Sequence, residues 1–88
     1  MKAGFRESFL KDLKNLKDKN LKALVNQTID QIMAVNNMLE IQNLKKLKSQ
    51  RNSYRIKLGE YRIGLLIEHD RVTFVRFLHK KEIYRYFP

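Results

Sequence analysis

The stretch of residues 54–84 constrains the fold of this chain more than any other part of the sequence. It runs YRIKLGEYRIGLLIEHDRVTFVRFLHKKEIY and is rich in β-branched and aromatic residues, which favour extended strands. Two turn-forming pairs, Gly59-Glu60 and His69-Asp70, interrupt it at the spacing of β-hairpins. The pattern therefore predicts three consecutive antiparallel strands joined by tight turns.

A two-residue turn between the first two of these strands fixes their register, and it sets Lys57 directly opposite Arg62. Since side chains alternate between the two faces of a strand, Arg55 joins both of them on one face. Like charges opposed across a ladder repel by roughly 0.2–1 kcal/mol, so we expect an anion to compensate this pair. The alternative is that these cations are the ordinary solvated surface of an antiparallel sheet.

The same register extends through the second turn into the third strand. It places Phe77 beside Arg62 and leaves His79 just beyond the end of the strand. The alternative for His79 is a structural histidine, and the alternative for Tyr84 is a core aromatic residue. The residues expected at the rim of the cationic side of the sheet are His79, Lys80, Lys81 and Tyr84.

Two amphipathic helices are expected before the strands. Ser8 is the predicted N-cap of the first helix, which spans residues 8–16. The second helix starts after a cap at Asp18 or Asn20 and carries an apolar stripe as far as Val35. Helices joined by so short a link pack as an antiparallel hairpin, which needs a second layer to cover its apolar stripes.

The predicted fold class is α+β, in the order β-α-α-β-β-β, with a short strand over residues 2–7 at the start. The helix hairpin packs on one face of a small antiparallel sheet and leaves the opposite face open for binding. No repeat, low-complexity tract or internal proline divides the chain, so residues 1–88 are expected to form a single domain.

A second group of cations lies in the segment of residues 36–53. Leu44 and Leu47 are expected to anchor a basic LKKLK turn, and a polar loop leads from there into the first long strand. A solvated loop is the alternative to phosphate binding by this group. The candidate RNA-binding residues of the segment are Lys45, Lys46, Lys48 and Arg51.

The charge of the chain indicates a polyanionic partner, because 19 lysines and arginines face only 9 acidic residues and leave a net charge of +10. Nucleic acid, an acidic protein and an anionic membrane all satisfy this requirement. With no cysteine and only two histidines, we expect no disulfide and no metal site. No apolar run approaches the length of a membrane span or a signal peptide, so a cytoplasmic location without membrane insertion is expected.

The cationic cluster suits scission of RNA without a metal. The sequence holds no glycine-rich phosphate loop, nucleophile elbow or paired carboxylates. We therefore expect no cofactor, and we do not expect a hydrolase that relies on carboxylates. RNA scission needs a base for the 2′-hydroxyl, cations near the phosphate and an acid for the leaving oxygen. A lysine crowded by other cations can act as the base, and a tyrosine can stack on a nucleobase or transfer a proton.

Three motifs of this sequence resemble the RelE/ParE superfamily of type II toxin–antitoxin toxins. They are FLKDLKNL at residues 9–16, YRIKLGEYRIG at residues 54–64 and FVRFLHKKEIYR at residues 74–85. Together with the order of helices and strands, the resemblance covers nearly the whole chain. It implies a RelE-like domain that a cognate antitoxin protein neutralises, by laying an acidic or amphipathic segment on the basic face or the helix hairpin.

RelE-like members of the superfamily cut mRNA on the ribosome with basic residues and often a C-terminal tyrosine, rather than with a metal. The resemblance therefore implies an endoribonuclease whose partners are mRNA and the ribosome. Lys80 stands where many active members have arginine, and a lysine cannot make the planar bidentate contact with phosphate. By position, the implied catalytic residues are Arg55, Lys57, Arg62, Lys80 and Tyr84, with His79 matching a histidine that many members carry.

Two alternatives to this function remain open at this point. ParE-like members share the fold and much of the YRI signature, yet they poison DNA gyrase. A catalytically inactive relative would bind RNA in a salt-sensitive way through its positive charge, without cleaving it.

Overall fold

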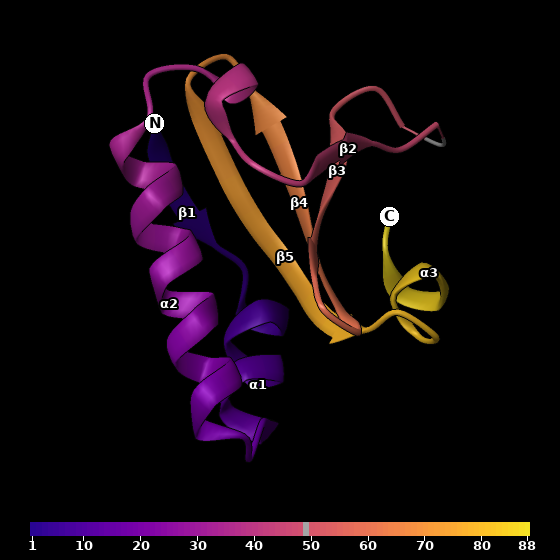
Figure 1. Ribbon diagram of the computed structural model, residues 1–88. Helices are drawn as coiled ribbons and strands as arrows, with labels where there is room; N and C mark the ends of the chain where they lie inside the picture. Colours follow the sequence, from indigo (N-terminus) through magenta and orange to yellow (C-terminus); the bar gives the residue numbers. More distant parts are fainter. Residues whose placement is uncertain (49) are drawn as a thin grey trace.

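The computed structural model describes residues 1–48 and 50–88 and has a five-stranded sheet at its centre, in the order β1-β5-β4-β3-β2 (Figure 1). The central and edge strands pair antiparallel, except that β1 runs parallel to β5. The prediction of a purely antiparallel sheet is wrong at this edge. β1 pairs with the last strand of the chain, so no hairpin turn sets its direction. The strands are β1 (Lys2–Phe5), β2 (Leu44–Lys46), β3 (Ser53–Leu58), β4 (Tyr61–Glu68) and β5 (Arg71–His79).

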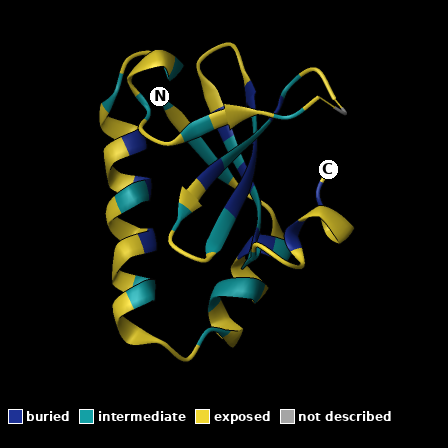
Figure 2. Cartoon of the chain, turned by 45° about the vertical axis from the view of Figure 1, so that its right-hand side comes forward, coloured by how far each residue is buried: buried dark blue, intermediate teal, exposed yellow. Residues whose placement is uncertain are grey.

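Two helices, α1 (Glu7–Asn15) and α2 (Lys19–Ala34), cover one face of the sheet, as the sequence predicted (Figure 1). Buried residues concentrate in the strands and along the inner side of α2 (Figure 2). The apolar stripe of the helices thus finds its partner layer in the alternate residues of the strands. The core consists of Phe9, Val25, Ile29, Ile32, Ile56, Ile63, Leu65, Ile67, Val72, Phe74 and Phe77.

The caps of the two helices match the predictions only in part. Asp18 caps α2, where its side chain accepts a hydrogen bond of 3.1 Å from the N–H of Leu21. The N-cap of α1 is Arg6 rather than Ser8, and it makes no side-chain cap hydrogen bond. The hydroxyl of Ser8 instead donates a bond of 2.6 Å to the carbonyl of Val75 in β5. Ser8 therefore fastens α1 to the sheet instead of starting the helix.

The segment after α2 contains more regular structure than predicted. A short 3-10 helix, η1 (Met38–Glu40), follows α2, and Asn37 and Glu40 form a capping box around it. The predicted LKKLK turn is wrong, because the residues of β2 pair with the free edge of β3 and set Lys45 opposite Arg55. The unpaired backbone N–H and C=O groups at the edge of β3 bind those of residues 44–46 and hold this segment as a strand.

The hairpin of β3 and β4 has the predicted register, with Lys57 opposite Arg62. Gly59 opens its turn with a φ of 58°, a left-handed conformation that favours glycine. The register of β4 and β5 differs from the prediction, because Leu65 pairs with Phe74 whereas Gly64 pairs with Arg76. Residue 75 is therefore an extra residue of a β-bulge.

The bulge moves the second half of β5 by one position. Arg62 lies opposite Leu78 and not Phe77, and His79 is the last residue of β5, opposite Tyr61. Because a shift of one residue reverses the faces of a strand, Phe77 points into the core. The predicted place of His79, beyond the strand end, is wrong for the same reason.

A third helix, α3 (Ile83–Tyr86), lies on the side of the sheet opposite α1 and α2 (Figure 1). Ile83 is completely buried and Phe87 is 3% exposed, although neither belongs to the main core. The face that the sequence predicted to be open is therefore partly covered. The two residues are four apart, which places both on the inner side of one helical turn.

The carboxylate of Asp12 fastens α1 to the edge of the sheet. It accepts hydrogen bonds from Nε of Arg76 at 2.8 Å, from Nη2 of Arg76 at 3.0 Å and from the N–H of Phe77 at 2.9 Å. β1 pairs with β5 only as far as Phe74, so this N–H lies on the edge that β1 leaves uncovered. The hydrogen bond with Asp12 raises the pKa of the Arg76 guanidinium above its ordinary range.

We expect Asp12→Ala to lower the free energy of unfolding by about 2–3 kcal/mol, because it leaves a part-buried guanidinium and a strand N–H without their charged partner. Urea denaturation followed by circular dichroism measures this loss. The control is Glu7→Ala, which removes an exposed carboxylate 3.6 Å from Lys11 on the same helix and should change stability little. Equal losses for the two variants would contradict a specific role for Asp12.

Candidate functional site

Four cations lie together on the face of the sheet that points away from the core. Arg55 and Lys57 alternate with the buried Ile56 along β3, and Arg62 lies opposite Lys57 on β4. β2 adds one more cation, since Lys45 lies opposite Arg55. Directly opposed residues of an antiparallel pair project on the same face. We call this surface, made by Lys45, Arg55, Lys57 and Arg62, the cationic face.

Backbone carbonyls hold both arginines of the cationic face. Nη1 of Arg62 donates to the carbonyls of Gly59 at 2.8 Å and Tyr61 at 2.9 Å. Nη1 of Arg55 donates to the carbonyl of Asn43 at 3.0 Å. These oxygens supply part of the negative charge expected beside the opposed cations. They use one nitrogen of each guanidinium, so its other N–H groups can contact an anion.

Lys57 differs from its neighbours on the cationic face. Its side chain is exposed and makes no hydrogen bond or ion pair with any residue that the structure describes. It is also the cation directly opposed to Arg62. A phosphate placed between these two side chains would relieve their repulsion.

Lys80, predicted to face the substrate, has an internal partner. Its Nζ lies 2.8 Å from Oε2 of Glu60, and its N–H donates a bond of 2.7 Å to the Glu60 carbonyl. The hydrogen bond and the charge of Lys80 lower the pKa of the Glu60 carboxyl below its ordinary value. A phosphate bound by Lys80 would compete with this carboxylate for the ammonium group.

His79 lies on the face opposite the cationic face. It pairs with Tyr61, and its ring meets the tyrosine ring edge-on with a distance of 5.5 Å between centroids. Nδ1 accepts a hydrogen bond of 3.1 Å from the N–H of Lys81. The prediction that His79 lies at the rim of the cationic face is wrong, because the bulge at residue 75 reverses this end of β5.

The other predicted RNA-binding residues are scattered. Lys46 lies opposite Tyr54, so it points to the side of the sheet opposite its neighbour Lys45. The remaining residues are exposed in loops, and their binding of RNA stays a prediction. They are Lys48 and Arg51 before β3 and Lys81 after β5.

Helix α3 brings a tyrosine to the cationic face. The ring of Phe87 lies against Gly64, which is two residues from Arg62 and directly opposite Arg55. The segment that carries α3 is therefore seated on this face. Tyr84 is 57% exposed within it, and the ring of Tyr86 lies 5.0 Å from the guanidinium of Arg76.

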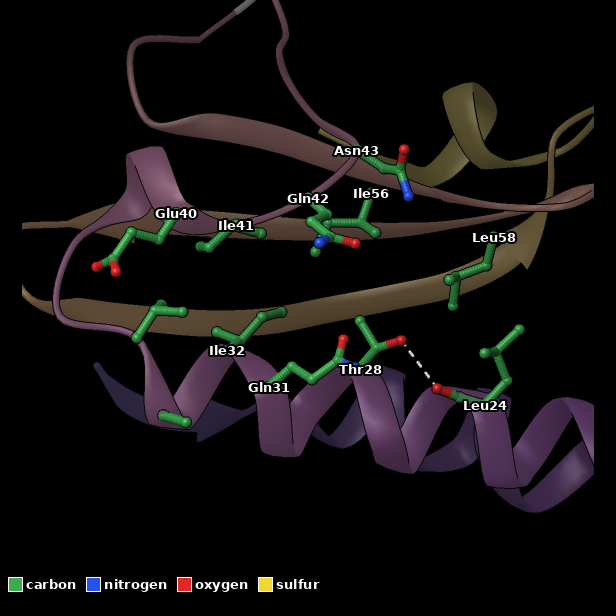
Figure 3. Close-up of a pocket in the computed structure, with 12 residues that line it drawn as sticks. Leu24, Thr28, Gln31, Ile32, Glu40, Ile41, Gln42, Asn43, Ile56 and Leu58 are labelled. Atoms are coloured by element: carbon green, nitrogen blue, oxygen red, sulfur yellow. Dashed lines mark hydrogen bonds between the residues drawn. The ribbon is translucent and has the colours of Figure 1, made fainter.

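A separate groove of about 540 Å³, lined mainly by apolar residues but also by Gln31, Glu40 and Gln42, lies between α2 and the segment that leads into β2. Figure 3 shows Leu24 and Ile32 of α2 on one side of it, and Ile41 and Leu58 on the other. Leu24 is 41% exposed, which is high for a leucine beside a core. The shape and lining suit an apolar segment of a partner protein.

Within residues 1–48 and 50–88, no helix is long and apolar enough to cross a bilayer. In the same residues, no three His, Cys, Asp or Glu side chains lie close enough together to hold a metal ion.

Comparison with known protein families decides the identity of the chain. Residues 4–84 match the family described as ParE toxin of type II toxin-antitoxin system, parDE. The chain belongs to this toxin family, within the RelE/ParE superfamily. The toxin is also 37% identical over 89 residues to Toxin RelE3 of Methanocaldococcus jannaschii, and the alignment covers both chains completely.

Solved structures of the superfamily share the fold of the toxin. The toxin matches a chain of the RelB-RelE antitoxin-toxin complex from Methanococcus jannaschii with a TM-score of 0.81 and 35% identity, covering 97% of this chain and 99% of that one. A chain of the intact E. coli RelBE complex matches with a TM-score of 0.68 and 20% identity, covering 89% of the toxin and 94% of that chain. The second match shows the fold alone.

Sequence reasoning missed several residues that shape the site. Glu60 and Lys80 lie far apart in the sequence, and no local pattern joins them. Gly64 gave a usable signal, since a glycine inside a strand indicates a bulge or the close approach of another segment. Here both occur, because Gly64 borders the bulge and receives the ring of Phe87.

The ion pair of Glu60 and Lys80 depends on pH. Because the pKa of Glu60 is lowered in the folded toxin, the pair is intact above the ordinary value of about 4.5 and is lost as the pH falls through the lower folded value. We expect an NMR titration of the Glu60 carboxyl carbon to have its midpoint below 4.5. Lys80→Ala should return the midpoint to the ordinary value, whereas Lys81→Ala should not. Identical midpoints in all three proteins would contradict the pairing.

Proposed function

We propose that the toxin is a metal-independent endoribonuclease that cleaves mRNA on the ribosome. One observation carries the proposal: Arg55, Lys57 and Arg62 converge on one face of the sheet, and the segment bearing Tyr84 is seated on that same face. Cations aimed at one point can stabilise the charge that develops on a phosphate during scission. The net charge of +10 supports binding to RNA.

The proposed reaction needs two proton transfers. The 2′-oxygen attacks the adjacent phosphorus, the bond from phosphorus to the 5′-oxygen breaks, and a cyclic phosphate and a 5′-hydroxyl result. The 2′-hydroxyl loses its proton to a base, and the leaving 5′-oxygen receives one from an acid. The arginines remain charged throughout and contact the phosphate oxygens. Lys57 and Tyr84 are exposed side chains that can exchange protons with the substrate.

Lys80 has a conditional role in this proposal. It joins the phosphate contacts when RNA displaces the carboxylate of Glu60 from its ammonium group. The mRNA and the ribosome are then the partners of the cationic face, and the toxin acts in the cytoplasm, where translation takes place.

We expect Arg62→Ala to abolish cleavage in cells, because it removes the cation that lies directly opposite Lys57 on the cationic face. Primer extension on mRNA from cells induced for the wild type should show new 5′ ends inside translated codons, and these should be absent with the variant. The matched control is Lys19→Ala, which removes one positive charge from the exposed start of α2. It should leave the pattern of 5′ ends unchanged.

Growth and DNA integrity of the same induced cells distinguish the alternative functions. Growth arrest with intact mRNA would point to another target, and gyrase-dependent DNA breaks would identify a ParE-like activity. Absence of any toxicity in the wild type would indicate an inactive relative.

We further propose that a cognate antitoxin neutralises the toxin and places an apolar segment in the groove beside α2. Two observations support this partner. A solved structure that matches the toxin at 35% identity is a complex of RelB with RelE. The groove exposes Leu24 beside the apolar walls formed by Ile32 and Ile41.

We expect Leu24→Glu to weaken capture of the antitoxin at least tenfold, because it puts a charge among the apolar side chains of the groove. Binding of the purified product of the neighbouring gene, measured by calorimetry, tests this. Leu39→Glu is the control, since Leu39 is 88% exposed and does not line the groove. Equal binding by both variants would place the antitoxin elsewhere.

A further inference from the structure

The ring of Phe87 occupies the space that a side chain at position 64 would fill. A Cβ atom built on Gly64 would lie 2.6 Å from Cδ2, 2.7 Å from Cγ and 3.0 Å from Cε2 of Phe87. Non-bonded carbon atoms do not approach so closely, because their optimal separation is about 3.5–4.0 Å. The missing side chain of Gly64 thus forms a notch in the cationic face, and the ring fills it.

The backbone does not require glycine at this position. Of the three glycines, Gly59 alone has a positive φ, and Gly64 lies within the ladder of β4 between Arg55 and Arg76. Any L-residue can adopt such a strand conformation. The space needed by Phe87 is therefore the steric requirement for glycine here.

Helix α3 is too short to be stable without packing against the sheet. α3 has four residues, far fewer than an isolated helix needs to be stable in water. Its buried side chain is Ile83, and the buried Phe87 follows as its C-cap. The N–H of Phe87 donates a hydrogen bond of 2.9 Å to the carbonyl of Ile83. Tyr84 and Tyr86 are more than half exposed. The burial of Ile83 and Phe87 therefore fixes α3 and, with it, the position of Tyr84.

We propose that Gly64 is a positioning residue, whose notch receives Phe87 and thereby sets Tyr84 at a fixed place relative to Arg62. The notch and Arg62 lie on the same face of the same strand, two residues apart. The cation and the docking point of the tyrosine-bearing helix thus share one rigid element. This inference rests on the proposed ribonuclease function, in which Tyr84 and Arg62 act on one phosphate.

The test is a double-mutant cycle on ribosome-dependent mRNA cleavage. We expect Gly64→Ala to lower kcat by about 10- to 100-fold, because a displacement of a catalytic group by about 1 Å has effects of this size. KM should change less than about threefold, since the phosphate-binding cations stay in place. Phe87→Ala should have a similar effect, and combining the two substitutions should lower kcat no further. Multiplicative losses would show that the new methyl group acts on something other than the ring, and would overturn the inference.

Gly4→Ala is the matched control for a methyl group added to the sheet. The new Cβ would lie 3.1 Å from Nη1 of Arg71, which is the end of a flexible side chain that can move aside. We expect kcat to stay within about twofold of the wild type, because β5 separates β1 from the strand that carries the notch.

An NMR measurement separates this inference from the proposed function. Contacts between the Phe87 ring and the α-protons of Gly64 should appear in the wild type, whatever the activity of the toxin. In Gly64→Ala, the ring should lose its contacts with β4, while the spectrum of the main core stays unchanged. An unmoved ring, or a displaced ring with unchanged kcat, would overturn the inference. A wild type that cleaves no mRNA would instead overturn the proposed function, and the positioning role with it.

Discussion

The free edge of β5 is the constraint on which the assembly of this toxin depends. β1 is too short to cover β5 along its whole length, so a part-buried strand N–H remains that must find a partner. Asp12 supplies one from α1, and the same carboxylate binds Arg76. The guanidinium in turn lies over the ring of Tyr86. One charged cluster thus connects the helix layer, the sheet and the C-terminal segment.

Repulsion between like charges opposes the strand pairing that forms the cationic face. Opposed cations destabilise a strand pair, yet the β3–β4 hairpin sets Lys57 and Arg62 side by side. Carbonyl oxygens of the turn moderate this repulsion without neutralising it. Glu60 pairs with Lys80 close by, so one more cation has a counterion in the free protein. The site is therefore stable enough to fold, and it still favours an added anion.

The parts of the fold that depend on local patterns could be predicted from the sequence. Alternating apolar residues and a two-residue turn determined the β3–β4 hairpin and the cations that share its face. The bulge at residue 75 could not be predicted, because its carbonyl is held by the hydroxyl of Ser8, far away in the chain. Because this bulge was not predicted, the predicted positions of Phe77 and His79 were wrong. The seat of α3 also escaped prediction, because four residues are too few for a helical period to show.

The lysines of β2 have a consequence for the behaviour of the toxin in solution. The five-stranded sheet is open, and β2 forms one of its two edges. An open edge is a template on which a second copy can add its own strand, and such additions lead to aggregates. Lys45 and Lys46 place positive charge along this edge, and approaching copies repel each other there. We therefore expect these two lysines, which the sequence predicted to bind RNA, to keep separate copies of the toxin apart.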